Sequence, residues 1–206
     1  VEQFVWEASR RGIPLSVYRP GFIMGDSANG RGNPKDFVSR LICGCIALGA
    51  YPALPRQRKE FIPVDYVSTA LLTIARRNNN PGKAYHLVPP DHAQSIDLDQ
   101  FFELICDSGY QLQKLPYARW IARLKTDPGL LDNPLMPLLP MLSEAVYQQQ
   151  TRWEVYENMP AYDASNTQAD LRAAGSTLKF TPMNKHQLLL HLDFWQKNGV
   201  LPGNKH

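Results

Sequence analysis

Long apolar runs, signal-like segments and an excess of charge of one sign are all missing from this chain of 206 residues. No apolar run approaches the roughly 18 residues that a membrane-spanning helix needs, and no segment has the pattern of a secretory signal. The formal net charge is only +3, and the basic residues are scattered, unlike those of nucleic-acid-binding proteins. We therefore expect a cytoplasmic protein that binds neither a membrane nor nucleic acid.

Cysteine is equally scarce, with Cys43, Cys45 and Cys106 as the three examples. The C-x-C pair has no second His/Cys pair nearby, so buried thiols in a reducing compartment are favoured over a metal site.

A G-x-G-x-x-G fingerprint is absent. The segment GDSANGRG follows its strand by too long a loop to be more than a weak phosphate cradle. The five histidines are scattered and give no argument for a Ser–His–Asp triad.

What the chain does contain is an alternation of helices and short strands up to about residue 125, followed by helices. We expect strands at 13–19, 60–64, 83–90 and 110–115, and loops at 22–32 and 50–59. We expect helices at 1–11, at 98–107 with Asp97 as the cap, and at 117–125. Further helices are expected to begin at Asn33-Pro34 and after a cap at Asp65, and to run from Ser165 or Asn166 to Gly175 and from Asn184 to Gly199. Strands that alternate with helices predict a parallel sheet in an α/β fold.

Two features suggest that more of the sheet lies elsewhere. About four short strands are too few for a doubly wound sheet, and the chain opens within a helical pattern without an N-cap. We expect a piece of a longer protein, with the missing strands upstream of Val1 and the strand at 13–19 deprived of its neighbours. The proline-rich segment 126–143 predicts short helical turns on a binding surface, a mobile lid, or an irregular hydrophobic packing segment.

Several segments together resemble a known family. They are GIPLSVYRPGFIMGDSANG, KEFIPVDYVSTALLTIA, YHLVPP, GYQLQKLPYARWIARL, YDASNTQADLRAAG and FWQKNGVLP. They resemble successive landmarks of extended short-chain dehydrogenase/reductases. The tail narrows the resemblance to the terminal thioester reductase domains of nonribosomal peptide and polyketide synthases and to carboxylic acid and aminoadipate reductases.

This resemblance implies a fold and a domain division. The fold is the C-terminal portion of a Rossmann-type reductase, mostly helical with a few short strands. Residues 1–32 would end the truncated dinucleotide-binding domain, and residues 33–206 would form a helical substrate-binding subdomain. Short strands near 60–64, 83–88 and 110–115 belong to the latter range, and the first two are expected to return to the Rossmann portion.

The resemblance also implies which residues meet the cofactor and the substrate. The end of the strand at 13–19 would abut the nicotinamide of NADPH, with Gly21 allowing close backbone approach and main-chain groups after it holding the carboxamide. The cofactor-binding residues are then Arg19, Pro20, Gly21, Phe22 and Ile23. The substrate-binding residues are Met24, Gly25, Asp26, Ser27, Lys59, Tyr117 and Trp120. Lys59 would meet the phosphate of a phosphopantetheine arm, unless it is a solvated loop charge, and packing explains Trp120 equally well.

No catalytic residue is assigned in this chain. The family's Tyr-x-x-x-Lys and Gly-rich turn are expected upstream of Val1, so the chain alone is predicted to be inactive. Tyr110 and Lys114 have the Tyr-x-x-x-Lys spacing. On a strand, however, four residues span roughly 13 Å, too far for the pair to couple, so we interpret that match as coincidence.

Three functions remain open from the sequence. The leading one is a fragment of an NADPH-dependent thioester reductase that releases an acyl or peptidyl chain from a phosphopantetheinylated carrier protein as an aldehyde or alcohol. A sugar-nucleotide epimerase or dehydratase has the same fold, and a non-catalytic docking domain for a carrier protein belongs to another class.

Overall fold

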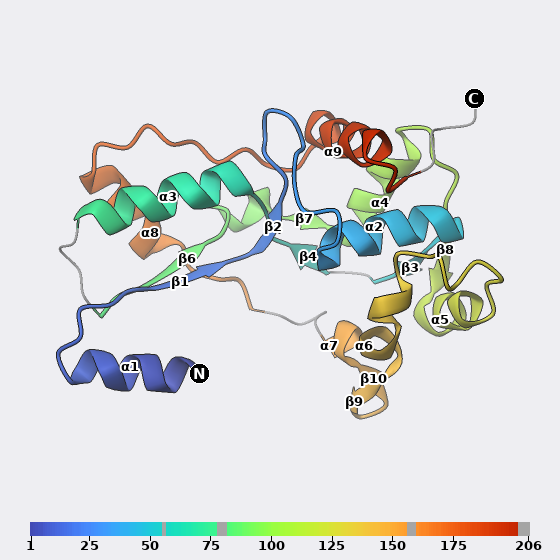
Figure 1. The fold of residues 1–206 in the computed structure, drawn as a ribbon, viewed down its shortest axis with the longest axis horizontal. Helices are drawn as coiled ribbons and strands as arrows, with labels where there is room; N and C mark the ends of the chain where they lie inside the picture. Colours follow the sequence, from blue (N-terminus) through green and yellow to red (C-terminus); the bar gives the residue numbers. More distant parts are fainter. Residues whose placement is uncertain (55–56, 78–81, 156–159, 202–206) are drawn as a thin grey trace. The chain divides into compact units, whose positions relative to one another are not determined.

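The computed structural model describes residues 1–54, 57–77, 82–155 and 160–201 (Figure 1). The chain divides into two compact units, each built from three separate stretches of sequence. Unit 1 comprises Val1–Met24, Glu60–Ser95 and Ala161–Pro182. Unit 2 comprises Gly25–Lys59, Ile96–Pro160 and Met183–His206.

The described residues of unit 1 form two parallel strand pairs and three α-helices. Its elements are α1 (Glu2–Arg10), β1 (Val17–Pro20), β2 (Phe22–Met24), β5 (Phe61–Pro63), α3 (Val64–Arg77), β6 (Ala84–Leu87), the 3-10 helix η1 (His92–Gln94) and α8 (Ser165–Ala173). Strand β1 pairs with β6, and β2 pairs with β5. Both pairs are parallel, as the alternating pattern predicted.

The Arg-Pro-Gly sequence marks the point where the chain changes its pairing partner. The Gly21 N–H donates to Leu87 O at the end of β6, and the Phe22 N–H donates to Glu60 O just before β5. A Cβ on Gly21 would lie 2.5 Å from Glu60 O. Glycine is therefore required here because the backbone of the next pair passes too close for any side chain.

The two faces of the β1–β6 pair differ in character. Tyr18 stacks on Tyr85 at 5.2 Å between ring centroids, and Tyr85 belongs to a buried cluster with residues of α3, β5 and α8. Figure 1 shows α1 on the opposite side of β1 from α3. Because successive side chains of a strand point to opposite faces, Arg19 and His86 lie on the α1 side.

Helix α8 closes the outer edge of β6. The Asn166 Nδ2 donates to Ala84 O at 3.0 Å, and the Thr167 hydroxyl donates to His86 O at 2.7 Å. These carbonyls alternate with those that β1 uses, so the side chains of α8 satisfy an edge that would otherwise present unpaired acceptors. The Tyr85 hydroxyl, at 2.7 Å from Asp170 Oδ2, adds a buried contact between the same two elements.

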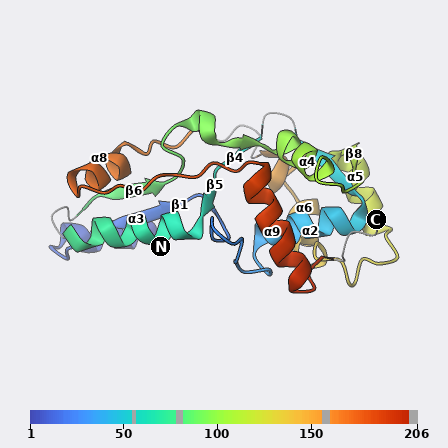
Figure 2. The same ribbon diagram turned by 90° about the horizontal axis from the view of Figure 1, so that it is seen from above.

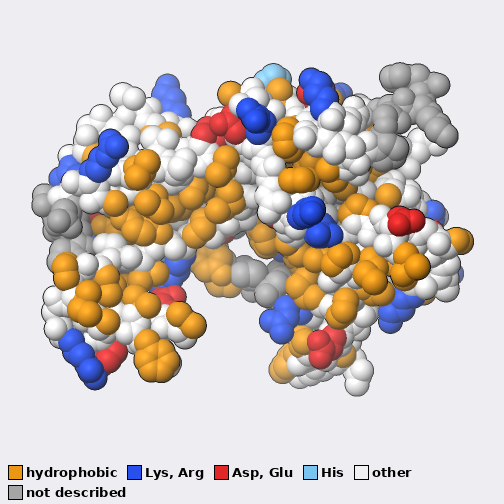
Figure 3. Space-filling view, in the orientation of Figure 1, with side chains coloured by type: hydrophobic (Ala, Val, Ile, Leu, Met, Phe, Trp, Pro, Cys, Tyr) orange, Lys and Arg blue, Asp and Glu red, His pale blue; other side chains and the backbone are white. Residues whose placement is uncertain are grey.

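Helix α1 contributes no buried residue to unit 1. Phe4 is 82% exposed, and Figure 3 shows hydrophobic side chains gathered over α1 at the lower left. The predicted helix is thus confirmed. Its Phe4 side chain is exposed, whereas Val5, Trp6 and Ala8 are half-buried.

Unit 2 is mainly helical and contains the remaining short strands. Its elements are α2 (Phe37–Leu48), β3 (Ala50–Ala53), β4 (Arg58–Lys59), β7 (Ile96–Asp97), α4 (Leu98–Cys106), β8 (Gln113–Pro116), α5 (Tyr117–Lys125), the 3-10 helix η2 (Met136–Leu138), α6 (Leu139–Ser143), β9 (Ala145–Tyr147), β10 (Gln150–Thr151), α7 (Arg152–Val155) and α9 (Lys185–Lys197). Strand β3 pairs in parallel with β8, β4 pairs antiparallel with β7, and β9 with β10 forms a hairpin. Helix α9 adjoins α4 (Figure 2).

Several predicted boundaries need correction. The loop predicted at 22–32 contains β2, and the loop predicted at 50–59 contains β3 and β4. Helix α2 begins at Phe37, because the Asp36 side chain caps it by accepting from the Ser39 N–H at 2.7 Å. The expected start at Asn33-Pro34 is a turn instead, in which the Asn33 side chain accepts from the Lys35 N–H.

Three further expectations were wrong in part. Asp65 does not cap α3 but lies in its first turn. The region after residue 125 is not purely helical, because it contains the β9–β10 hairpin. The strand around 13–19 keeps one neighbour, β6, although no other strand pairs with β1 among the described residues. Within 126–143 the chain forms the short helical turns η2 and α6, with Leu135 and Leu142 fully buried.

Within the described ranges, no helix combines the length and the apolar character needed to cross a membrane.

Candidate cofactor and substrate site

The segment Arg19–Ile23 presents apolar side chains at the carboxyl end of β1. Pro20 is exposed, and Ile23 is 39% exposed although isoleucine is usually buried. The carboxyl ends of parallel strands are where open α/β sheets bind ligands. An exposed apolar surface at such a position fits the face of a nicotinamide ring. The Phe22 N–H donates to Glu60 O, so this main-chain donor is already committed and does not fit the expected role of holding the carboxamide.

The Arg19 side chain is held from two sides. Its guanidinium donates to the Glu2 carboxylate of α1 and lies 3.0 Å, from Nη1, from Nε2 of His86. The hydrogen bond from Arg19 is the first cause that lowers the pKa of Glu2. The Nδ1 of His86 lies 3.1 Å from the carbonyl oxygen of Asp163, and its ring meets Tyr162 edge-on at 5.3 Å. This network joins β1, β6, α1 and the segment before α8, all within unit 1.

The predicted substrate residues Gly25, Asp26 and Ser27 form the start of a tight loop in unit 2. The Asp26 N–H donates to Arg31 O at 2.8 Å, and the Ser27 carbonyl accepts from the Gln187 side chain of α9 at 3.0 Å. A Cβ on Gly25 would lie 2.4 Å from Gly30 O. The loop is therefore fixed in shape by its own backbone and by α9.

The far side of this loop packs against α9. Gly30 has a φ of +69°, and a Cβ there would lie 2.3 Å from Leu190 O. His191 of α9 is buried beneath it. Burial lowers the pKa of His191 to about 4, and a backbone hydrogen bond with Gly30 opposes this shift.

Lys59 is buried, contrary to its interpretation as a solvated loop charge. Only 3% of the residue is exposed, and its Nζ lies 4.4 Å from the ring centroid of Trp153. A cation over an aromatic face is a favourable contact. Trp153 also packs against Phe37 and accepts, through its carbonyl, a 2.7 Å hydrogen bond from the buried Gln57. Sequence reasoning missed Trp153 because no motif or spacing links it to Lys59.

Tyr117 contacts the same stretch of unit 2 as Lys59. Its hydroxyl donates to Leu142 O at 2.8 Å, and burial raises the pKa of Tyr117. Trp120 is fully buried, and its indole N–H donates to Ala50 O at 3.2 Å. The packing interpretation therefore explains Trp120, and Met24 is likewise buried at 5% exposure.

The interpretation of Tyr110 and Lys114 as a coincidental match agrees with their contacts. Lys114 lies on β8 and pairs with Asp99 at 2.7 Å, whereas the Tyr110 hydroxyl accepts from Gln196 at 2.8 Å. The two side chains are thus committed to different partners.

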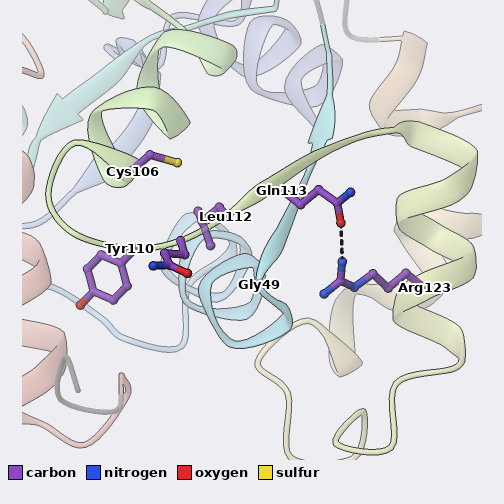
Figure 4. A pocket seen from close by; sticks show the side chains of 7 residues that line it. Gly49, Cys106, Tyr110, Leu112, Gln113 and Arg123 are labelled. Atoms are coloured by element: carbon purple, nitrogen blue, oxygen red, sulfur yellow. Dashed lines mark hydrogen bonds between the residues drawn. The ribbon is translucent and has the colours of Figure 1, made fainter. Parts of the chain in front are cut away.

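An open pocket of about 420 Å³ lies near Tyr110 in unit 2 (Figure 4). It is lined by Gly49, Cys106, Tyr110, Gln111, Leu112, Gln113 and Arg123. The Arg123 guanidinium donates to Gln113 and to Leu48 O, the latter at the C-terminal end of α2. Arg123 therefore braces the end of a helix, and the predicted site residues are not among those that line this pocket.

Comparison with known proteins shows similarity to an NAD-binding family and to fungal peptide synthetases and reductases. The NAD-binding family described as male sterility protein matches residues 1–71. The chain is 41% identical over 201 residues to the nonribosomal peptide synthetase asaC of Aspergillus flavus, covering 98% of the chain and 20% of that protein. It is 40% identical over 207 residues to the aldehyde reductase lnaA of the same organism, again covering 98% of the chain and 20% of the relative.

A solved structure is similar along nearly the whole chain. The terminal R domain from the myxalamid PKS-NRPS biosynthetic pathway superposes with a TM-score of 0.81 at 29% identity, covering 98% of this chain and 48% of that one. The chain thus spans about a fifth of the length of the two curated relatives and about half of this R domain.

The fold is that of the C-terminal portion of an extended short-chain dehydrogenase/reductase, as predicted. Within that class, the predicted relationship to the terminal reductase domains of nonribosomal peptide synthetases is confirmed.

Proposed function

We propose that the protein is an NADPH-dependent reductase that releases an acyl or peptidyl chain from the phosphopantetheine thiol of a carrier protein. The observation that carries this proposal is the similarity, at 40% identity or more over nearly the whole chain, to a peptide synthetase and to an aldehyde reductase. The exposed apolar strand end in unit 1 supports a cofactor position at Arg19–Ile23.

The reaction has a simple balance. NADPH supplies a hydride to the thioester carbonyl, and collapse of the resulting hemithioacetal expels the thiol and leaves an aldehyde. A proton completes the free thiol, and a second hydride and proton give the alcohol. In this scheme Arg19–Ile23 of unit 1 support the cofactor, and the loop from Gly25 in unit 2 meets the thioester arm.

The chemistry of proton donation is proposed to come from residues outside this chain. Residues 1–206 taken alone are therefore proposed to be inactive, and NADPH oxidation by that polypeptide with an acyl-pantetheine thioester would contradict this. For the whole protein, the division at residue 32 into a dinucleotide-binding part and a substrate-binding part remains our proposal.

The test is a reaction of the whole protein with an acyl chain loaded on holo carrier protein. We expect NADPH consumption, followed by absorbance at 340 nm, together with aldehyde or alcohol identified by mass spectrometry. Release of a carboxylic acid without NADPH consumption would refute the proposal. A parallel assay with NADH determines the cofactor preference.

Assays on the same whole protein distinguish the reductase from the two other functions. Turnover of a nucleoside-diphosphate sugar, with no reduction of the thioester, would favour an epimerase or dehydratase. Binding of holo carrier protein without affinity for NADPH would favour a docking domain. The names of the relatives at 40% identity or more support the reductase over both alternatives.

A further inference from the structure

His86 of β6 lies directly beside Arg19 of β1 at the carboxyl end of the parallel pair. The two residues are partners in the strand register. Arg19 belongs to the segment proposed to meet the cofactor, whereas His86 belongs to no motif used so far. The neighbours of His86 decide which of its ring nitrogens donates and which accepts.

The contacts of His86 admit only one neutral tautomer. The carbonyl oxygen of Asp163 can only accept, so Nδ1, at 3.1 Å, must carry a proton and donate to it. The guanidinium of Arg19 can only donate, so Nε2, at 3.0 Å, must be the acceptor. A proton at Nε2 would point a donor at the Arg19 guanidinium, which has no acceptor, and in the imidazolium it would also place two positive charges side by side.

The same contacts hold Arg19 in one orientation. Glu2 accepts from its Nε and Nη2, and His86 accepts from its Nη1. Among the described residues, these bonds use three of the five N–H donors of the guanidinium. The arginine is thus braced on two sides while its side chain stays 40% exposed.

We propose that His86, which accepts from Arg19 at Nε2, is a positioning residue that orients Arg19 toward the bound dinucleotide. This inference rests on the proposed function, because the dinucleotide is the ligand that Arg19 would meet. Its consequence is a cofactor affinity that weakens when residue 86 can no longer accept a hydrogen bond from Arg19.

The test measures NADPH binding directly, by titration calorimetry on the whole protein. His86→Leu removes the acceptor, while Glu2 still holds Arg19 from the other side. We therefore expect the Kd to rise by up to about tenfold, the size of effect that the loss of one hydrogen bond to a charged group can have. His86→Gln can still offer a carbonyl oxygen to Arg19, so we expect it to bind close to the wild type.

His92→Gln is the matched control, because His92 is exposed on η1 in the same unit and lies outside this network. It should bind as the wild type does. Equal binding by His86→Leu and the wild type would overturn the inference, and so would a loss of affinity in His86→Gln as large as that in His86→Leu. If His86→Leu does not fold, His86→Ala takes its place in the same comparison. Failure of the wild type to bind NADPH would instead refute the cofactor in the proposed function.

Discussion

Replacement of Gly21 by alanine tests the point where the chain passes from β6 to β5 as its pairing partner. The new Cβ would lie 2.5 Å from Glu60 O, 3.0 Å from Glu60 Cβ and 3.1 Å from Ile62 Cγ1. The nearest of these is a backbone atom, so a side-chain rotation cannot relieve the contact and the two strands must separate. Overpacking of this kind costs about 1–3 kcal/mol.

The expected effect is local. The separation would lengthen the hydrogen bonds that Gly21 and Phe22 donate to Leu87 and Glu60. A loss of about 1–3 kcal/mol in the free energy of local opening corresponds to a roughly 5- to 150-fold larger open population. Hydrogen exchange of the whole protein, read by mass spectrometry on peptides covering β1, β2 and β6, measures this population.

Gly129→Ala is the matched control for this experiment. A Cβ on Gly129 would meet its nearest neighbour, the Asp127 carboxylate, at 3.6 Å, which is ordinary van der Waals contact. We expect exchange within the range of neutral surface substitutions, about ±0.5 kcal/mol. Unchanged exchange in Gly21→Ala, or an equal change in both variants, would show that the crossing does not depend on the missing side chain.

Three further predictions follow from buried polar groups. The pKa of His191 is about 4 in the folded protein against an ordinary 6.5, so the unfolded chain binds more protons between these two pH values. The free energy of unfolding should therefore fall by about 3 kcal/mol from pH 6.5 to pH 4. Pulse proteolysis in urea should show a smaller fall for His191→Gln. Burial raises the pKa of Cys43 to about 12 and also raises that of Cys45. Iodoacetamide at pH 8 should therefore modify Cys106 first in the folded protein, and peptide mapping would reveal the order. Early labelling of Cys43 or Cys45 would contradict this. Thr167→Val leaves an outward carbonyl of β6 without its 2.7 Å donor and should cost about 1–3 kcal/mol, seen as faster exchange in β6 but not in α9.

The long amphipathic helices could be predicted because their signals are local. Helix α5 occupies the predicted residues, Tyr117–Lys125, and the caps at Asp97 and Asn184 are confirmed. The strands were harder because their pairing is decided by distant segments. Ala50–Ala53 contains a proline and was predicted to be a loop, yet it pairs with Gln113–Pro116. A two-stranded pair tolerates the missing N–H of proline, which a central strand would not.

The candidate site shows the same limit. The Arg-Pro-Gly strand end could be found because it is a contiguous motif. Its partners Glu2 and His86 lie 17 and 67 residues away in sequence. The β1–β6 register brings His86 to Arg19, and the position of α1 beside β1 brings Glu2 there. Lys59 was singled out in the sequence, but its burial under Trp153 depends on a segment near residue 150 that carries no recognisable signal.

The two faces of β1 explain why a motif of three residues controls so many contacts. Tyr18 commits one face to the core through its stacking on Tyr85, so Arg19, the next residue, must point to the other face. Helix α8 satisfies the far edge of β6, so the position of His86 is fixed from behind by a hydrogen bond to its carbonyl and from the side by Asp163. Pro20 and Gly21 then end the pairing with β6 at the level of Leu87. The orientation of Arg19 is therefore set by the packing of the opposite face and by α8. A substitution in α8 that loosens β6 should disturb Arg19 without touching it.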